Sequence, residues 1–217
     1  TPVTPVVLVH GMLSGRRSMQ PMSDAMRQDG YPIMNWTYKT MGRSINQHAE
    51  RLAEDIADRR LHQITGRLHF VGHSMGCIVI RQTVRFLDLA KGSRIVMLAP
   101  PNAGSRLTRL PLGPFAGWFP HLVELSESSD SFVNRLPEPS STEVGVIAAR
   151  RDKIVDLHST RLNTMRDHLV VDTSHQRLPT NPNVIHQARR FLSTGSFDRA
   201  SDFDTSLNSA QEQRKAA

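Results

Sequence analysis

The stretch from His69 to Gln82, HFVGHSMGCIVIRQ, joins a short apolar run to an apolar segment with helical spacing. Between them lies Gly72-His73-Ser74-Met75-Gly76, which fits the pattern G-x-S-x-G. A strand that turns this sharply into a helix needs flanking glycines, because the two backbones approach too closely for Cβ atoms. Such a turn strains the serine backbone and directs its hydroxyl toward the helix N-terminus, where partial positive charge favours an oxyanion. The pattern therefore predicts Ser74 as a nucleophile.

Short apolar runs alternate with helical patterns along the rest of the chain. Strands are predicted at residues 6–9, 31–37, 68–71, 94–99, 143–149 and 168–172, and helices at 18–28, 44–62, 75–89 and 184–192. Continuous apolar strands are typical of a sheet that is covered on both faces. The alternation favours an α/β fold with a mainly parallel sheet of about six strands, whose ligands bind at the carboxyl ends of the strands.

The chain of 217 residues suits one domain. We expect this domain over residues 1–193, with a lid-like insertion at 107–136 and a polar C-terminal tail at 194–217. No apolar run approaches the roughly 20 residues that cross a bilayer, and no signal peptide is visible. We therefore expect a soluble protein, and the sequence leaves its compartment open.

The formal net charge is +7 and the pI is near 10.4, but the arginines are scattered. No nucleic-acid-binding motif accompanies them, so the charge favours a solvated surface, or one in transient contact with anionic interfaces, over a nucleic-acid partner. The one cysteine, Cys77, excludes an intrachain disulfide. No group of side chains has zinc-ligand spacing, so no zinc site is expected, although a structural calcium and the oligomeric state stay open.

A serine hydroxyl needs a base to activate it, and the base needs an acid to orient it. In this type of fold the acid and then the base follow later strands. Asp152 follows the strand at 143–149 and is the predicted acid, whereas Asp156 lies farther into the connection. His175 follows the last strand and is the predicted base. His168 is expected at the start of that strand, which is the wrong end of the sheet.

An acyl-transfer site also needs backbone N–H groups that stabilise the tetrahedral oxyanion. One predicted donor is the amide of Met75, directly after the nucleophile. The other is the amide of Met12, in the loop that follows the first strand at His10 and Gly11. We expect His10 to be a structural hydrogen-bonding residue and not a second base.

The segments VVLVHGMLSG, FVGHSMG, GVIAARRDKIV and DHLVVDTSHQRL, in this order, resemble the α/β-hydrolase superfamily. The resemblance runs from Pro5 to Leu192 and is to the minimal bacterial lipases and lipase-like esterases. It implies an α/β-hydrolase fold, a Ser74–His175–Asp152 catalytic triad and no cofactor. From this resemblance we expect the two leading strands of the larger family members to be absent, as they are in the minimal lipases.

The default chemistry is hydrolysis of a small-molecule or lipid carboxylic ester through an acyl-enzyme on Ser74. Leu13, Phe115, Trp118 and Phe119 are candidate substrate-binding residues. The aromatic residues of the insertion, with Leu122, could instead pack on the core. A thioesterase or an acyltransferase would use the same triad. A non-catalytic scaffold and a basic interaction module are the remaining alternatives.

Overall fold

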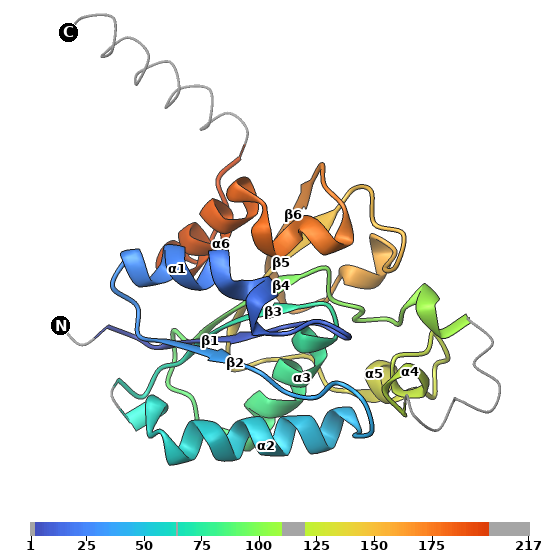
Figure 1. Ribbon diagram of the computed structural model, residues 1–217, viewed down its shortest axis with the longest axis horizontal. Helices are drawn as coiled ribbons and strands as arrows, with labels where there is room; N and C mark the ends of the chain where they lie inside the picture. Colours follow the sequence, from blue (N-terminus) through green and yellow to red (C-terminus); the bar gives the residue numbers. More distant parts are fainter. Residues whose placement is uncertain (1–2, 64, 110–119, 200–217) are drawn as a thin grey trace, which may run out of the picture.

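The computed structural model describes residues 3–63, 65–109 and 120–199 of the chain. Within them six strands form one sheet in the order β2-β1-β3-β4-β5-β6, and every neighbouring pair is parallel (Figure 1). The strands are β1 (Val6–Val9), β2 (Ile33–Trp36), β3 (His69–His73), β4 (Arg94–Leu98), β5 (Glu143–Ala149) and β6 (Met165–Val171). This confirms the predicted α/β fold with a parallel sheet.

Helices cover both faces of the sheet (Figure 1). Helices α1 (Gln20–Gln28) and α6 (Pro182–Thr194) lie on one face, and α2 (Ile45–Asp58) and α3 (Met75–Thr83) lie on the other. Successive side chains of a strand point to opposite faces. In β1 the residues at 6 and 8 join the core beside α1 and α6, and those at 7 and 9 join the core beside α2 and α3. Burial on both faces explains the continuous apolar runs in the sequence.

Two helices end earlier than the sequence pattern predicts. Helix α2 begins with a capping box between Ser44 and Gln47, but it ends at Asp58 and not at residue 62, because Arg60 takes a positive φ of 52°. Helix α3 gives way after Thr83 to a tighter turn at 84–86. The Thr83 hydroxyl donates to the Val79 carbonyl at 2.8 Å, a contact that often bends helices. No helix in the described ranges is both long and apolar enough to cross a membrane.

Strand β6 forms an edge of the sheet and starts before the predicted apolar run. His168 therefore lies in the middle of the strand, and the expectation that it begins the strand is wrong. Its ring Nε2 is 3.0 Å from Thr160 Oγ1. Arg166, Asp167 and His168 of β6 are polar, but backbone pairing with β5 does not need apolar side chains on a half-exposed edge strand.

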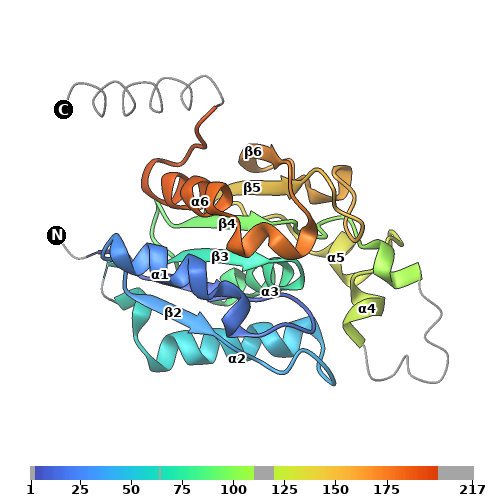
Figure 2. The ribbon, with the colours of Figure 1, turned by 45° about the horizontal axis from the view of Figure 1, so that its top comes forward.

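The segment 107–136 contains helices α4 (Pro120–Glu124) and α5 (Phe132–Arg135) in its described part. Both lie on the side of the sheet where the arrows of β4 and β5 end (Figure 2). Leu122 is buried but belongs to neither of the two hydrophobic cores of the sheet, whereas Leu125 packs in the core beside α2 and α3. Phe115, Trp118 and Phe119 lie outside the described residues, as does most of the predicted tail.

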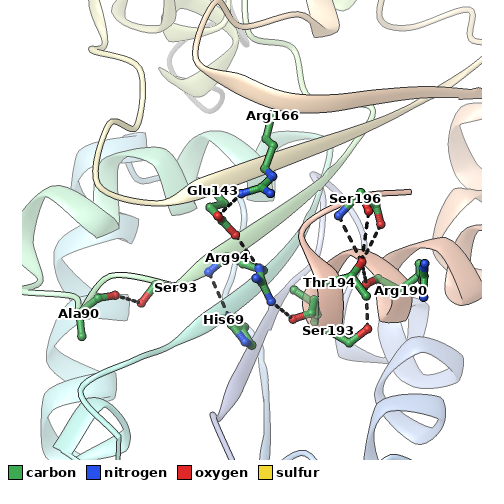
Figure 3. Close-up of polar contacts among 11 residues, drawn as sticks. His69, Ala90, Ser93, Arg94, Glu143, Arg166, Arg190, Ser193, Thr194 and Ser196 are labelled. Atoms are coloured by element: carbon green, nitrogen blue, oxygen red, sulfur yellow. Dashed lines mark hydrogen bonds and ion pairs between the residues drawn. The ribbon is translucent and has the colours of Figure 1, made fainter. Parts of the chain in front are cut away.

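The amino ends of the strands are joined by charged and polar side chains (Figure 3). At the start of β4, the Arg94 amide donates to His69 Nδ1 at 3.0 Å, and Arg94 Nε donates to Glu143 Oε2 at 2.7 Å. Arg166 pairs with the same carboxylate from β6. These charged and polar side chains are hydrogen-bonded or ion-paired to one another, so we do not place the candidate site in this network.

Candidate active site

Ser74 occupies the turn between β3 and α3 with φ 53° and ψ −125°, a conformation that side chains other than glycine rarely adopt. The Ser74 amide donates to the Leu98 carbonyl of β4 at 2.9 Å, which ties the turn to the neighbouring strand. Strained residues of this kind concentrate at functional sites. Three residues further on, Cys77 is buried and its thiol pKa is raised by burial, so it is not a competing nucleophile.

The two glycines of the motif are required by the packing around this turn. A Cβ atom at Gly76 would lie 2.4 Å from the Val9 carbonyl oxygen and 2.5 Å from that of His10. A Cβ at Gly72 would lie 2.9 Å from the Cys77 backbone nitrogen. The end of β1 therefore passes directly against the start of α3, and this brings the loop after β1 to the serine.

His175 and Asp152 meet at the carboxyl ends of β5 and β6. His175 Nδ1 donates to Asp152 Oδ2 at 2.7 Å, and both side chains are almost fully buried. The other carboxylate oxygen accepts the amides of Ile154 and Val155 at 2.8 and 2.9 Å. Burial acts to raise the Asp152 pKa, but these hydrogen bonds outweigh it and hold the pKa below its usual value. An ionised Asp152 fixes the imidazole tautomer and leaves Nε2 to accept a proton.

Main-chain hydrogen bonds between the two loops set this geometry. The Arg150 amide donates to the Val171 carbonyl at 2.8 Å, and the Arg151 amide donates to the Thr173 carbonyl at 3.0 Å. Asp156, the alternative acid in the sequence, forms an ion pair with Arg106. Of the two candidate acids, only Asp152 contacts His175 in the described structure.

His73, the residue before the serine, connects the nucleophile turn to the predicted base. Its Nε2 donates to the backbone carbonyl of His175 at 3.0 Å, and the two rings lie 4.9 Å apart. Burial, with His175 nearby, lowers the pKa of His73 to about 3, so the ring is neutral. Sequence reasoning took His73 only as a variable position of the motif. His73 and His175 are 102 residues apart along the chain, so no local sequence pattern predicts their contact.

The predicted oxyanion donors border Ser74. A Cβ at Gly11 would lie 3.1 Å from Ser74 Cβ, so the loop after β1 touches the nucleophile turn. The loop turns at Leu13, whose φ is 54°. The Leu13 amide donates to Thr40 Oγ1 at 3.2 Å. The amides of Met12 and Met75 have no acceptor within the part of the chain that the structure describes. The prediction that these two amides bind an oxyanion stays a prediction.

His10 has a structural environment, as expected from the sequence. It is fully buried, its Nδ1 donates to the Gly11 carbonyl at 2.9 Å, and its ring stacks on Tyr38 at 4.5 Å. The Tyr38 hydroxyl donates to the His10 carbonyl at 3.0 Å. Burial lowers the His10 pKa. Tyr38, which sequence reasoning did not select, thus holds the loop that carries Met12, and Trp36 stacks on its ring at 4.6 Å.

Helix α4 packs on the same loop. The buried His121 donates from Nε2 to the Met12 sulfur at 2.9 Å. Glu124, one turn further along α4, accepts the Ile45 amide at the start of α2 at 2.8 Å. The described part of the segment 107–136 therefore packs against the loop after β1 that carries Met12.

A depression of about 730 Å³ borders this loop on the outside. Leu13, which was predicted to bind substrate, lines the depression together with Tyr38 and Met41, and its side chain is 68% exposed. No group of three or more His, Cys, Asp or Glu side chains among the described residues could hold a metal ion.

A serine at a strand–helix turn, a buried His–Asp pair and a parallel sheet together define an α/β-hydrolase. The model of the alpha/beta hydrolase family matches residues 6–210, so the chain belongs to this family. No curated protein matches its sequence.

Solved structures share the fold at low sequence identity. The product of the Listeria innocua gene lin2722 is 14% identical with a TM-score of 0.65, over 91% of this chain and 96% of that one. Phospholipase PlaB from Legionella pneumophila is 16% identical with a TM-score of 0.68, over 90% of this chain and 60% of that one. Aspergillus fumigatus lipase B is 15% identical with a TM-score of 0.70, over 88% and 52%. The chain thus spans just over half the length of the latter two.

Proposed function

We propose that the protein is a serine hydrolase that cleaves carboxylic esters through an acyl-enzyme on Ser74. The observation that carries this proposal is the strained serine turn, joined through His73 to a base whose Nδ1 is bound by a buried carboxylate. This arrangement supplies a nucleophile, a base and an orienting acid in one cluster.

In the first half-reaction the Ser74 oxygen attacks the ester carbonyl carbon while His175 Nε2 takes the hydroxyl proton. The carbonyl oxygen becomes an oxyanion, which the Met12 and Met75 amides stabilise. The intermediate collapses by breaking the bond to the alcohol oxygen, and His175 donates its proton to the departing alcohol. The products of this half-reaction are the free alcohol and an ester between the acyl group and Ser74.

In the second half-reaction a water molecule attacks the acyl carbon. His175 takes a proton from this water and then returns a proton to the Ser74 oxygen as the acid leaves. Asp152 stays ionised throughout, since its carboxylate also accepts two backbone amides. It stabilises the protonated imidazole without accepting its proton.

The substrate class follows from the surface beside the site. Leu13 and Met41 are exposed apolar side chains next to the oxyanion loop and suit an acyl chain or an apolar alcohol. Lipase B and phospholipase PlaB, which share the fold, carry names of ester hydrolases, and this favours esters over peptides. Thioesters offer the same carbonyl chemistry and form the second candidate class.

The test is hydrolysis of p-nitrophenyl esters from acetate to palmitate by the wild type, Ser74→Ala and Ser141→Ala. Ser141 is an exposed serine far from the motif in the sequence and serves as the matched control. We expect Ser74→Ala to abolish turnover and labelling by a fluorophosphonate, and Ser141→Ala to keep both.

A parallel assay with acyl-coenzyme A thioesters separates the remaining classes. Turnover of thioesters but not of oxygen esters would replace the proposal with a thioesterase. A wild type that neither hydrolyses esters or thioesters nor reacts with the fluorophosphonate would identify a non-catalytic scaffold. Undiminished turnover by Ser74→Ala would exclude Ser74 as the nucleophile.

A further inference from the structure

The depression beside the oxyanion loop, here called the apolar depression, lies within reach of the nucleophile. Gly11 contacts Ser74, and Leu13 follows two residues later, a distance of at most about 7 Å along the chain. Met41 lies across the depression and is 43% exposed. A molecule bound at Ser74 could therefore extend an apolar chain over these side chains.

A second depression of about 470 Å³ continues from the first, because Tyr38, Lys39, Met41 and Gly42 line both. Its lining includes three cations, Lys39, Arg43 and Arg51, and no carboxylate among the described residues. We call it the cationic depression. Clefts lined by charges of one sign concentrate counter-ions and charged ligands.

None of these three cations forms an ion pair within the described ranges, which is also true of surface cations elsewhere such as Arg59 and Lys91. What sets the three apart is that they line one depression together. Two nearby carboxylates are engaged, since Glu124 accepts the Ile45 amide and Asp55 accepts Trp36 Nε1 at 2.6 Å. Glu50 and Glu54 are exposed on α2 and do not line the depression. The positive charge of the cationic depression is thus left for a ligand to neutralise.

His48 adds an independent sign of a missing ligand. It lies on α2, lines the cationic depression and is 1% exposed, yet neither ring nitrogen has a hydrogen-bond partner in the described structure. A buried polar group without a partner destabilises the folded state unless a ligand or water satisfies it. Burial, with His121, Arg43 and Arg51 nearby, lowers the His48 pKa to about 4, and the nearby Thr40 backbone offsets this only in part. A bound anion would act in the same direction as Thr40.

We infer that the two depressions together bind an anionic amphiphile, with its apolar chain on Leu13 and Met41 and its phosphate, sulfate or carboxylate group in the cationic depression. The inference rests on the proposed function for the ester bond at Ser74, and it narrows the substrate class to esters that carry a negative charge. Such a substrate supplies acceptor oxygens to His48 and counter-charge to the three cations.

Binding is tested by calorimetry with octyl phosphate below its micelle concentration, and with octanol, on the Ser74→Ala protein. The variant Lys39→Gln/Arg43→Gln/Arg51→Gln removes the cations, and Arg59→Gln/Arg67→Gln/Lys91→Gln removes the same charges from exposed sites elsewhere. An exposed ion pair contributes a factor of about 1.4 to 5 in affinity. We expect the first variant to weaken octyl phosphate binding about tenfold and the second to change it less than twofold.

Two further measurements make the test local. Octyl phosphate binding by Ser74→Ala should weaken as sodium chloride is raised, and the His48 ring resonances should shift on binding. Octyl phosphate should also inhibit wild-type hydrolysis of p-nitrophenyl butyrate competitively. Binding no tighter than that of octanol, equal losses in the two variants, or non-competitive inhibition would each overturn the inference.

Vesicles of phosphatidylglycerol and phosphatidylcholine distinguish a bound molecule from a charged surface. Binding to these vesicles without binding of monomeric octyl phosphate would mean attraction to the membrane surface alone, and the inference would be wrong. If the wild type hydrolyses no ester, the proposed function fails, but the calorimetry on Ser74→Ala still decides whether the anionic amphiphile binds.

Discussion

Replacing Gly76 by alanine is expected to cost both stability and activity, because the new methyl group meets backbone and not a flexible side chain. The alanine Cβ would lie 2.4 Å from the Val9 carbonyl oxygen and 2.5 Å from that of His10. A carbon–oxygen contact needs about 3.3 Å. The end of β1 and the start of α3 must therefore separate by about 0.9 Å.

The expected magnitude follows from two opposing effects. Overpacking in a well-packed region costs about 1–3 kcal/mol, and the upper part of that range applies because two fixed carbonyls collide. Alanine is more favourable than glycine in a helix by about 1 kcal/mol, which offsets part of this cost. The net loss in the free energy of unfolding is then about 2 kcal/mol, which lowers the melting temperature of a chain of this size by about 4–8 °C.

The effect on turnover is expected to be larger than the effect on stability. The same displacement moves the loop of Gly11 and Met12 away from Ser74, and a misplacement of about 1 Å can lower the rate about 100-fold. Urea unfolding and p-nitrophenyl butyrate turnover measure the two effects. Gly15→Ala is the matched control, because nothing lies within 4 Å of its new Cβ. Equal behaviour of the two variants would refute the packing argument.

Two further predictions concern the base and its acid. His73→Phe removes the donor to the His175 carbonyl, so the free energy of unfolding should fall by about 1–3 kcal/mol and kcat should fall with KM little changed; an unchanged kcat would remove the positioning role. The Asp152 pKa is lower in the folded state than its unfolded value near 3.9, so ionised Asp152 stabilises the fold above that pH. This contribution to stability is lost as the pH falls below about 4. Unfolding measured from pH 2 to 6 should therefore show a shallower acid loss for Asp152→Asn than for the wild type, and equal slopes would contradict this.

The sequence predicts the nucleophile turn and the strands well because local rules decide them. Gly72 and Gly76 are dictated by close backbone approach, and a strand buried on both faces must be apolar throughout. Asp152 could be preferred over Asp156 from its short distance to the strand end, and its contact with His175 agrees with that choice. The catalytic roles of these residues stay predictions.

Contacts between distant segments could not be predicted. His73 and His175 are separated by 102 residues, and the stack of His10 on Tyr38 also joins two loops. The start of β6 escaped the pattern because an edge strand tolerates polar side chains. The sequence suits Leu122 equally to a pocket or to the core, since an apolar residue among prolines and glycines carries no period that separates the two. In the structure it is buried outside both hydrophobic cores of the sheet.

Because β6 lies at the edge of the sheet, the position of His175 can be lost before the fold as a whole unfolds. An outermost strand has a neighbour on one side only, so it can open locally at a lower free energy than the central strands. Opening of β6 would carry His175 away while Ser74, held between β3, β4 and α3, stays in its turn. We therefore expect heat to displace His175 before it unfolds the turn at Ser74, so that substitutions that stabilise β6 would keep His175 in place at higher temperature.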